Sequence, residues 1–167
     1  LRKVKNLTAL VRALPFLDEA WQLVIAGEGP ERGAILAEAE RLGIEDRLHL
    51  PGFVADPAGI AGLFDVFALS SLSEQFPISL IEAMAAGLPV AAPAVGDVAE
   101  MVAEANRPFI VAPGDEDALG RALAALAGDP ALRKRIGEAN RASARRNYDE
   151  RVMIERYKAL YWGLMGR

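Results

Sequence analysis

Short apolar segments alternate with helix-length segments along the chain, and this alternation constrains the fold more than any other feature of the sequence. Apolar strands separated by helices are typical of a parallel sheet that is covered by helices on both faces. We therefore expect an α/β fold with a Rossmann-like, doubly wound parallel sheet. The expected strands lie within residues 21–30, 47–53, 65–71, 89–94 and 108–113.

The helical spacing of apolar residues locates the segments between these strands. An Asp-Glu-Asp run at 115–117 is similar to an acidic metal-binding motif, but it opens a helix, so we interpret it as capping. Basic residues within 133–146 alternate with small and acidic residues, as on a solvated helix face. The expected helices occupy residues 6–17, 30–44, 56–64, 77–86, 97–104, 115–129, 130–148 and 149–165.

Composition restricts the classes of function. The 167 residues, 52% hydrophobic and 25% charged, suit one domain over residues 1–167, and no segment is long and apolar enough for a membrane span. The start shows no signal-peptide pattern, which favours a cytoplasmic protein. The chain lacks cysteine, its only histidine, His49, alternates with leucines on a strand, and the formal net charge of −4 gives no case for nucleic-acid binding.

Doubly wound sheets bind ligands outside the carboxyl ends of their strands. The candidate binding region therefore consists of the loops at 27–30, 51–56, 70–76 and 94–97. The third of these loops leads into a helix so apolar that we expect it to be buried on all sides.

That helix is predicted to open at Pro77, because proline at the first helical position loses no intrahelical hydrogen bond. The N–H groups of Ile78, Ser79 and Leu80 would then be free. Together with the positive end of the helix dipole, these groups would suit a phosphate.

Two acids, Glu74 and Glu82, lie near this helix start. Side chains tilt toward the N-terminus of a helix, so Glu82 can reach back toward the phosphate site and accept hydrogen bonds from the hydroxyls of a ribose. Glu74 precedes the helix, where an exposed acid could meet the hydroxyls of a sugar. Alternatively, Glu82 pairs with a core arginine, since a lone buried acid is costly, and Glu74 only covers the surface.

Glu74 and Glu82, followed by AMAAGLPV, resemble the E-x7-E signature of retaining nucleotide-sugar glycosyltransferases. The segments VKN, IAGEGP, LHLPGFV, DVFALSS, VGDVAEMV and FIVAPGD follow the order of the same family. Over nearly its whole length the chain is therefore similar to glycosyltransferase family 4, or glycosyl transferases group 1, whose GT-B architecture has two Rossmann-like halves. It resembles the C-terminal, donor-binding half.

The resemblance implies that the full-length enzyme transfers a hexosyl group from a nucleotide diphosphate sugar to an acceptor such as a glycan or lipid, with retention and without a cofactor or metal. An N-terminal, acceptor-binding half is expected outside this sequence, and the helix at 149–165 is expected to cross toward it. Peripheral membrane association of the full-length enzyme, self-association of the isolated chain and inactivity of the isolated chain are further expectations.

The resemblance also implies roles for individual residues. Lys5 would contact the diphosphate, Glu74 the transferred sugar and Glu82 the ribose. Gln75 departs from the family, which commonly has glycine there, and the arginine that accompanies Lys5 in the family would precede Leu1. A nucleotide-sugar epimerase of similar architecture and a non-catalytic nucleotide-binding module remain alternatives. Phe76, Pro77, Ile78 and Ser79 would approach the sugar and phosphates, and Gly52, Phe53 and Val54 would lie near the base.

Overall fold

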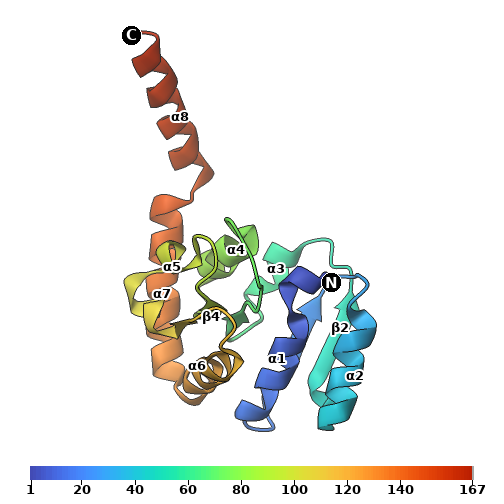
Figure 1. Ribbon diagram of the computed structural model, residues 1–167. Coiled ribbons are helices and arrows are strands. Elements are labelled where there is room, and N and C mark those ends of the chain that lie inside the picture. Colours follow the sequence, from blue (N-terminus) through green and yellow to red (C-terminus); the bar gives the residue numbers. More distant parts are fainter. Residues whose placement is uncertain (167) are drawn as a thin grey trace.

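Two small parallel sheets form the centre of the computed structural model, which describes residues 1–166 (Figure 1). In the first sheet, β1 (Leu23–Ala26) pairs with β2 (Leu48–Gly52). In the second, β4 (Val90–Pro93) lies between β3 (Phe67–Ala68) and β5 (Ile110–Val111). The α/β class and the parallel pairing confirm the prediction, and every expected strand is present. The hydrogen-bonded strands nevertheless fall into two groups, because β1 and β3 are not paired within the described residues.

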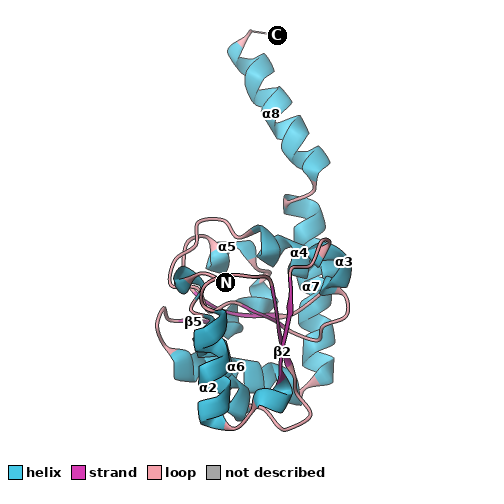
Figure 2. Ribbon diagram, turned by 90° about the vertical axis from the view of Figure 1, so that its right-hand side faces the viewer, coloured by secondary structure: helices cyan, strands magenta, loops and turns pink. Residues whose placement is uncertain are grey.

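Helices cover the strands on both sides, as Figure 2 shows for α2 and α3 on either side of β2. One layer packs α1 against α2 and α6, and the other packs α4 against α3 and α7. The α-helices are α1 (Leu7–Ala13), α2 (Arg32–Leu42), α3 (Pro57–Ala61), α4 (Ile78–Ala86), α5 (Val98–Met101), α6 (Glu116–Gly128), α7 (Pro130–Asn147) and α8 (Glu150–Leu164). Short 3-10 helices are η1 (Lys3–Lys5), η2 (Leu14–Phe16), η3 (Glu45–Arg47) and η4 (Glu104–Phe109).

Helix α4 is apolar but is not buried on all sides, contrary to the prediction. Leu80, Ala83 and Met84 are buried, and Leu80 and Met84 belong to the core cluster that includes Val90 and Ala92 of β4. Ile78, in contrast, is 68% exposed, since the first turn lies at the loop edge of the domain where no helix covers it. The apolar composition of this helix therefore reflects one buried face and an open N-terminal end.

A polar cluster lies inside the apolar core beside β4. The side chain of Asn106, fully buried, accepts a hydrogen bond from the N–H of Val90 and donates one to its carbonyl, both at 2.8 Å. Asn140 of α7 donates to the Asn106 side-chain oxygen and to the Leu88 carbonyl, also at 2.8 Å. Because every polar atom in this cluster has a partner, the cluster fixes the edge of β4 without leaving an unpaired group.

Helix α8 extends away from the α/β body in both views (Figures 1 and 2). It has no buried residue, and several large apolar side chains are exposed along it, including Tyr157, Leu160 and Leu164. Its crossing toward another half of the protein stays a prediction. Within residues 1–166, no helix combines the length and the apolar character needed to cross a bilayer.

We predict that Asn106→Ala lowers the free energy of unfolding by about 3 kcal/mol, because it leaves buried donors and an acceptor without partners. Urea unfolding measures the change. Asn147→Ala is the matched control: its amide bonds only Ser143 in a half-buried position, so it should cost less than about 1 kcal/mol. Equal losses in the two variants would contradict the role given to the cluster.

Candidate functional site

The loop that follows β3 is tied to the first turn of the chain. The Ser70 hydroxyl donates a hydrogen bond to the carbonyl of Lys5 at 2.8 Å. Two residues after Ser70, the N–H of Leu72 donates a hydrogen bond to the carbonyl of Val4, also at 2.8 Å. These bonds join segments far apart in the sequence and bring Lys5 beside Glu74.

Lys5 and Glu74 form an ion pair, with 2.6 Å between the ammonium nitrogen and a carboxylate oxygen. The hydroxyl of Ser71 donates to the same oxygen at 2.6 Å. The Glu74 side chain is 12% exposed and that of Lys5 is 42% exposed, so the acid is more buried than the sequence suggested. Burial raises the pKa of Glu74, but the hydrogen bonds from Lys5 and Ser71 and the charge of Lys5 outweigh it and lower the pKa below its ordinary value.

Gly96 allows the loop after β4 to pack against the Glu74 loop. Its φ is +54°, and a Cβ there would lie 2.3 Å from the Glu74 carbonyl oxygen and 2.6 Å from that of Gln75. The N–H of Asp97 donates to the Gln75 carbonyl at 3.0 Å. The family commonly has glycine at the position of Gln75. Among the described residues Asn6 is the only non-glycine residue with a positive φ, so the backbone at Gln75 does not need the conformational freedom of glycine.

The start of α4 differs from the prediction. Pro77 has φ −71° and ψ 113°, which is extended backbone, so it caps the helix and Ile78 is the first helical residue. The N–H of Leu80 donates to the Pro77 carbonyl at 3.1 Å and is therefore not free. The N–H groups of Ile78 and Ser79 have no acceptor in the part of the chain that the structure describes. Two amides, rather than three, are available to an anion.

A cavity of about 540 Å³ lies between β1 and β3 and reaches the first turn of α4. Lys5, Ser79 and Glu82 line it, and Arg2 does so as well. Glu82 is half-buried and makes no ion pair or hydrogen bond within residues 1–166, so the alternative in which it pairs with a core arginine is not found. Its carboxylate is therefore available to a ligand.

Other residues predicted for the site do not line this cavity. Gly52 ends β2, Phe53 and Val54 follow it, and the Phe53 side chain is 76% exposed. Phe76 instead packs edge to face on Tyr148, with 5.7 Å between ring centroids. Pro77 and Ile78 also lie outside the cavity lining. The cavity thus brings together Lys5, Ser79 and Glu82, whereas Glu74 does not line it and is linked to it through the ion pair with Lys5.

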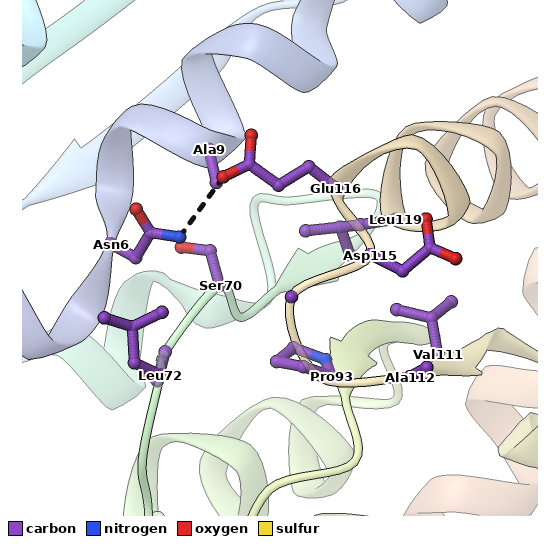
Figure 3. A pocket seen from close by; sticks show the side chains of 12 residues that line it. Asn6, Ala9, Ser70, Leu72, Pro93, Val111, Ala112, Asp115, Glu116 and Leu119 are labelled. Carbon is purple, nitrogen blue, oxygen red and sulfur yellow. Dashed lines mark hydrogen bonds between the residues drawn. The ribbon is translucent and has the colours of Figure 1, made fainter.

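A second pocket lies near the carboxyl ends of β3, β4 and β5, where Ser70, Pro93 and Val111 approach one another (Figure 3). Its volume of about 20 Å³ suits roughly one water molecule, which is too little for a sugar or nucleotide. The Glu116 carboxylate at its rim accepts a hydrogen bond from Asn6 at 3.5 Å.

The acidic run at 115–117 caps α6, as predicted. The Asp115 carboxylate accepts a hydrogen bond from the N–H of Ala118 at 2.8 Å. Glu116 pairs with the Arg12 guanidinium at 2.7 Å, which joins α6 to α1. His49 lies on the surface and hydrogen-bonds to Gln22 at 2.8 Å, which agrees with a structural histidine.

The model of the family described as glycosyl transferases group 1 matches residues 1–143. The chain belongs to the glycosyl transferases group 1 family. This confirms the resemblance seen in the sequence.

Curated relatives of this group 1 glycosyl transferase domain carry names of the same kind. N-acetyl-alpha-D-glucosaminyl L-malate synthase from Bacillus anthracis is 28% identical over 166 residues, which cover 98% of this chain and 44% of the relative. Phosphatidyl-myo-inositol mannosyltransferase from Mycobacterium leprae is 32% identical over 163 residues, covering 94% of this chain and 42% of the relative. The chain spans less than half the length of these relatives.

Solved structures share the fold. Anabaena Alr3699/HepE in complex with UDP superposes with a TM-score of 0.88 at 25% identity, over 98% of this chain and 46% of that one. Sucrose-phosphate synthase from Thermosynechococcus elongatus superposes with a TM-score of 0.86 at 26% identity, over 99% of this chain and 43% of that one. The GT-B relationship predicted from the sequence is therefore confirmed, whereas the roles of the site residues stay predictions.

We predict that Glu74→Gln flattens the dependence of stability on pH. The lowered pKa of Glu74 favours the charged acid in the folded state, so its contribution is complete above the ordinary pKa of 4.5 and is lost as pH falls through the lower folded-state pKa. The free energy of unfolding of the wild type should therefore fall more steeply below about pH 5 than that of the variant. Urea titrations at several pH values measure this difference.

Glu19→Gln provides the control, since Glu19 is exposed and has no ion pair among the described residues. It should keep the wild-type dependence on pH. If Glu74→Gln also keeps it, the ion pair with Lys5 does not stabilise the fold.

Proposed function

We propose that this domain binds a nucleotide diphosphate sugar and is the donor-binding half of a retaining hexosyltransferase. The observation that carries the proposal is the free Glu82 carboxylate in the same cavity as Lys5 and the first turn of α4. A carboxylate and a cation placed together match the hydroxyl groups and the diphosphate of such a donor. The UDP complex of the structurally similar Alr3699/HepE supports the same class of ligand.

The diphosphate would be bound by Lys5 and by the free amides of Ile78 and Ser79. Amides at a helix start point toward an anion, and the helix dipole favours negative charge there. Because Lys5 is paired with Glu74, binding of the donor would move the ammonium group to a position between the carboxylate and the phosphates. Glu74 would then face the transferred sugar while Ser71 keeps hold of its carboxylate.

Glu82 would accept hydrogen bonds from the ribose hydroxyls. The exposed ring of Phe53, together with Gly52 and Val54, would border the base, at the rim beyond the cavity. The backbone of Phe76 and Pro77 would flank the sugar.

Transfer itself would depend on stabilising the charge of the departing diphosphate by Lys5 and the α4 amides. The acceptor, a glycan or a lipid, would be held by the remainder of the protein, on which α8 would pack through its exposed apolar side chains. No metal is assigned to this step, and a chelator should leave the activity of the full-length protein unchanged. The names of the relatives, a synthase and a mannosyltransferase, favour a transferase over an epimerase.

Calorimetric titration of the domain with UDP tests the site. We expect Lys5→Met and Glu82→Ala each to weaken binding at least about 10-fold, because each removes a charged partner of the ligand. Lys3→Met and Glu40→Ala are the matched controls. Lys3 is an exposed lysine two residues before Lys5, and Glu40 is an exposed glutamate far from Glu82 in the sequence. Both variants should keep the affinity for UDP within about 2-fold of the wild type. If neither site variant differs from its control, the domain is a different kind of nucleotide-binding or interaction module.

The product of the full-length protein tests the reaction. With a labelled nucleotide sugar and an acceptor, we expect the anomeric configuration of the donor to be retained in the product, as measured by NMR. The isolated domain should transfer nothing, because it lacks the acceptor-binding half. An inverted product would contradict retention, and transfer by the domain alone would contradict this division of labour.

A further inference from the structure

The junction between α7 and α8 lies close to the loop that carries Glu74. Only two residues separate these helices, since Tyr148 caps the end of α7 and Asp149 caps the start of α8. In Figure 1, α8 leaves the α/β body at this point, next to α5. The junction is thus the place where α8 is joined to the rest of the structure.

Tyr148 is held at this junction by contacts on several sides. Its N–H donates to the carbonyl of Ala144 in the last turn of α7 at 2.8 Å. Its hydroxyl donates to the carbonyl of Met101, the last residue of α5, at 3.4 Å. Its half-buried ring packs against the core cluster that includes Leu80 of α4. Burial and the charge of Asp97 both raise the pKa of the Tyr148 hydroxyl, which keeps it protonated and able to donate.

The ring of Tyr148 also supports the Glu74 loop (residues 70–77). It contacts Phe76 edge to face, with 5.7 Å between the ring centroids and 73° between the ring planes. Rings in this arrangement attract each other beyond the effect of the surface that they bury. Phe76 is otherwise 48% exposed, and Tyr148 is its one aromatic partner within residues 1–166. The contact therefore fixes the Phe76 side chain from a distant part of the sequence.

Phe76 lies between two parts of the predicted donor site. Glu74 is two residues before it, and the unpaired amides of Ile78 and Ser79 begin two residues after it. Before Phe76, the ion pair of Glu74 fixes the loop. After Phe76, the side chains of Ile78 and Ser79 are exposed, so their amides are held in place by the buried Pro77 and by the Phe76 ring.

We infer that Tyr148 is a positioning residue for the predicted donor site, because it holds the Glu74 loop through the ring of Phe76. Without this contact the backbone after Phe76 would be less restrained, and the amides of Ile78 and Ser79 would no longer be aimed together at an anion. Coupling between two sites acts in both directions, so a ligand bound at these amides would also steady Tyr148 and the junction. The inference rests on the proposed function for the class of ligand, but the order of the loop can be measured without a ligand.

Backbone amide relaxation, measured by NMR on the ligand-free 167-residue chain, tests the positioning directly. In the wild type we expect order parameters of about 0.85 at Ile78 and Ser79, as in rigid backbone, and values of about 0.6 or less in Tyr148→Leu. Tyr148→Phe keeps the ring and should keep the wild-type values. Tyr157→Leu is the matched control, since Tyr157 is 57% exposed on α8 and has no aromatic partner among the described residues.

Calorimetric titration with UDP tests the consequence for binding. Tyr148→Leu and Phe76→Leu should each weaken binding about 3- to 10-fold, and the double variant should lose no more than about 10-fold, because both changes remove the same contact. In the wild type, UDP should slow hydrogen exchange of the Tyr148 amide at least about 3-fold. The amide of Leu132, at the other end of α7, is the internal control and should be unaffected.

The inference is overturned if folded Tyr148→Leu keeps the wild-type order parameters at Ile78 and Ser79. It is also overturned if the losses of affinity multiply in the double variant, or if bound UDP does not protect the Tyr148 amide. Should Tyr148→Leu not fold, Phe76→Leu, which changes a half-exposed side chain, must lower the same order parameters. A wild-type chain that does not bind UDP would contradict the proposed function, whereas the relaxation data would still decide the role of Tyr148.

Discussion

The ion pair between Lys5 and Glu74 is the interaction on which the arrangement of the candidate site depends. It joins the first turn of the chain to the loop after β3, and Ser71 holds the same carboxylate from the other side. The pair is largely shielded on the side of the acid, where a charge without a partner would be costly. A ligand that replaces Glu74 as the partner of the Lys5 ammonium group must therefore carry a negative charge of its own. This favours strongly anionic ligands.

The order of strands and helices could be predicted from the sequence because it follows from local periodicity. Apolar runs and glycine or proline punctuation located each of the five strands in the described chain. The start of α4 was misjudged by one residue, since the ψ of Pro77 is set by the direction of the incoming loop rather than by proline itself. The burial of α4 was overestimated because composition does not reveal which end of a helix lies at the edge of the domain.

The site was predicted only in part, for a related reason. Glu74 and Glu82 could be singled out from their spacing and from the family pattern, and Lys5 from the family pattern alone; Lys5 and Glu82 line the same cavity. Ser71 and the close packing of Gly96 were missed. Ser71 acts through a hydrogen bond to Glu74 that depends on how the loop after β3 folds back, and Gly96 acts through its contact with the backbone of Glu74 and Gln75 in a different loop. A serine three residues before Glu74 was the only local signal for the first, and a glycine in the loop after β4 was the only one for the second.

The buried pair of asparagines beside β4 affects the relative position of the loops that follow β3 and β4. Asn106 engages both backbone groups of Val90, while the amides of Phe67 and Leu69 bond to the carbonyls on either side of it. A slip of β4 by one residue would break all of these bonds and turn its buried side chains to the opposite face. The cluster thus fixes the register of β4 against β3. It thereby fixes the relative position of the loops that follow these strands and carry Glu74 and Gly96.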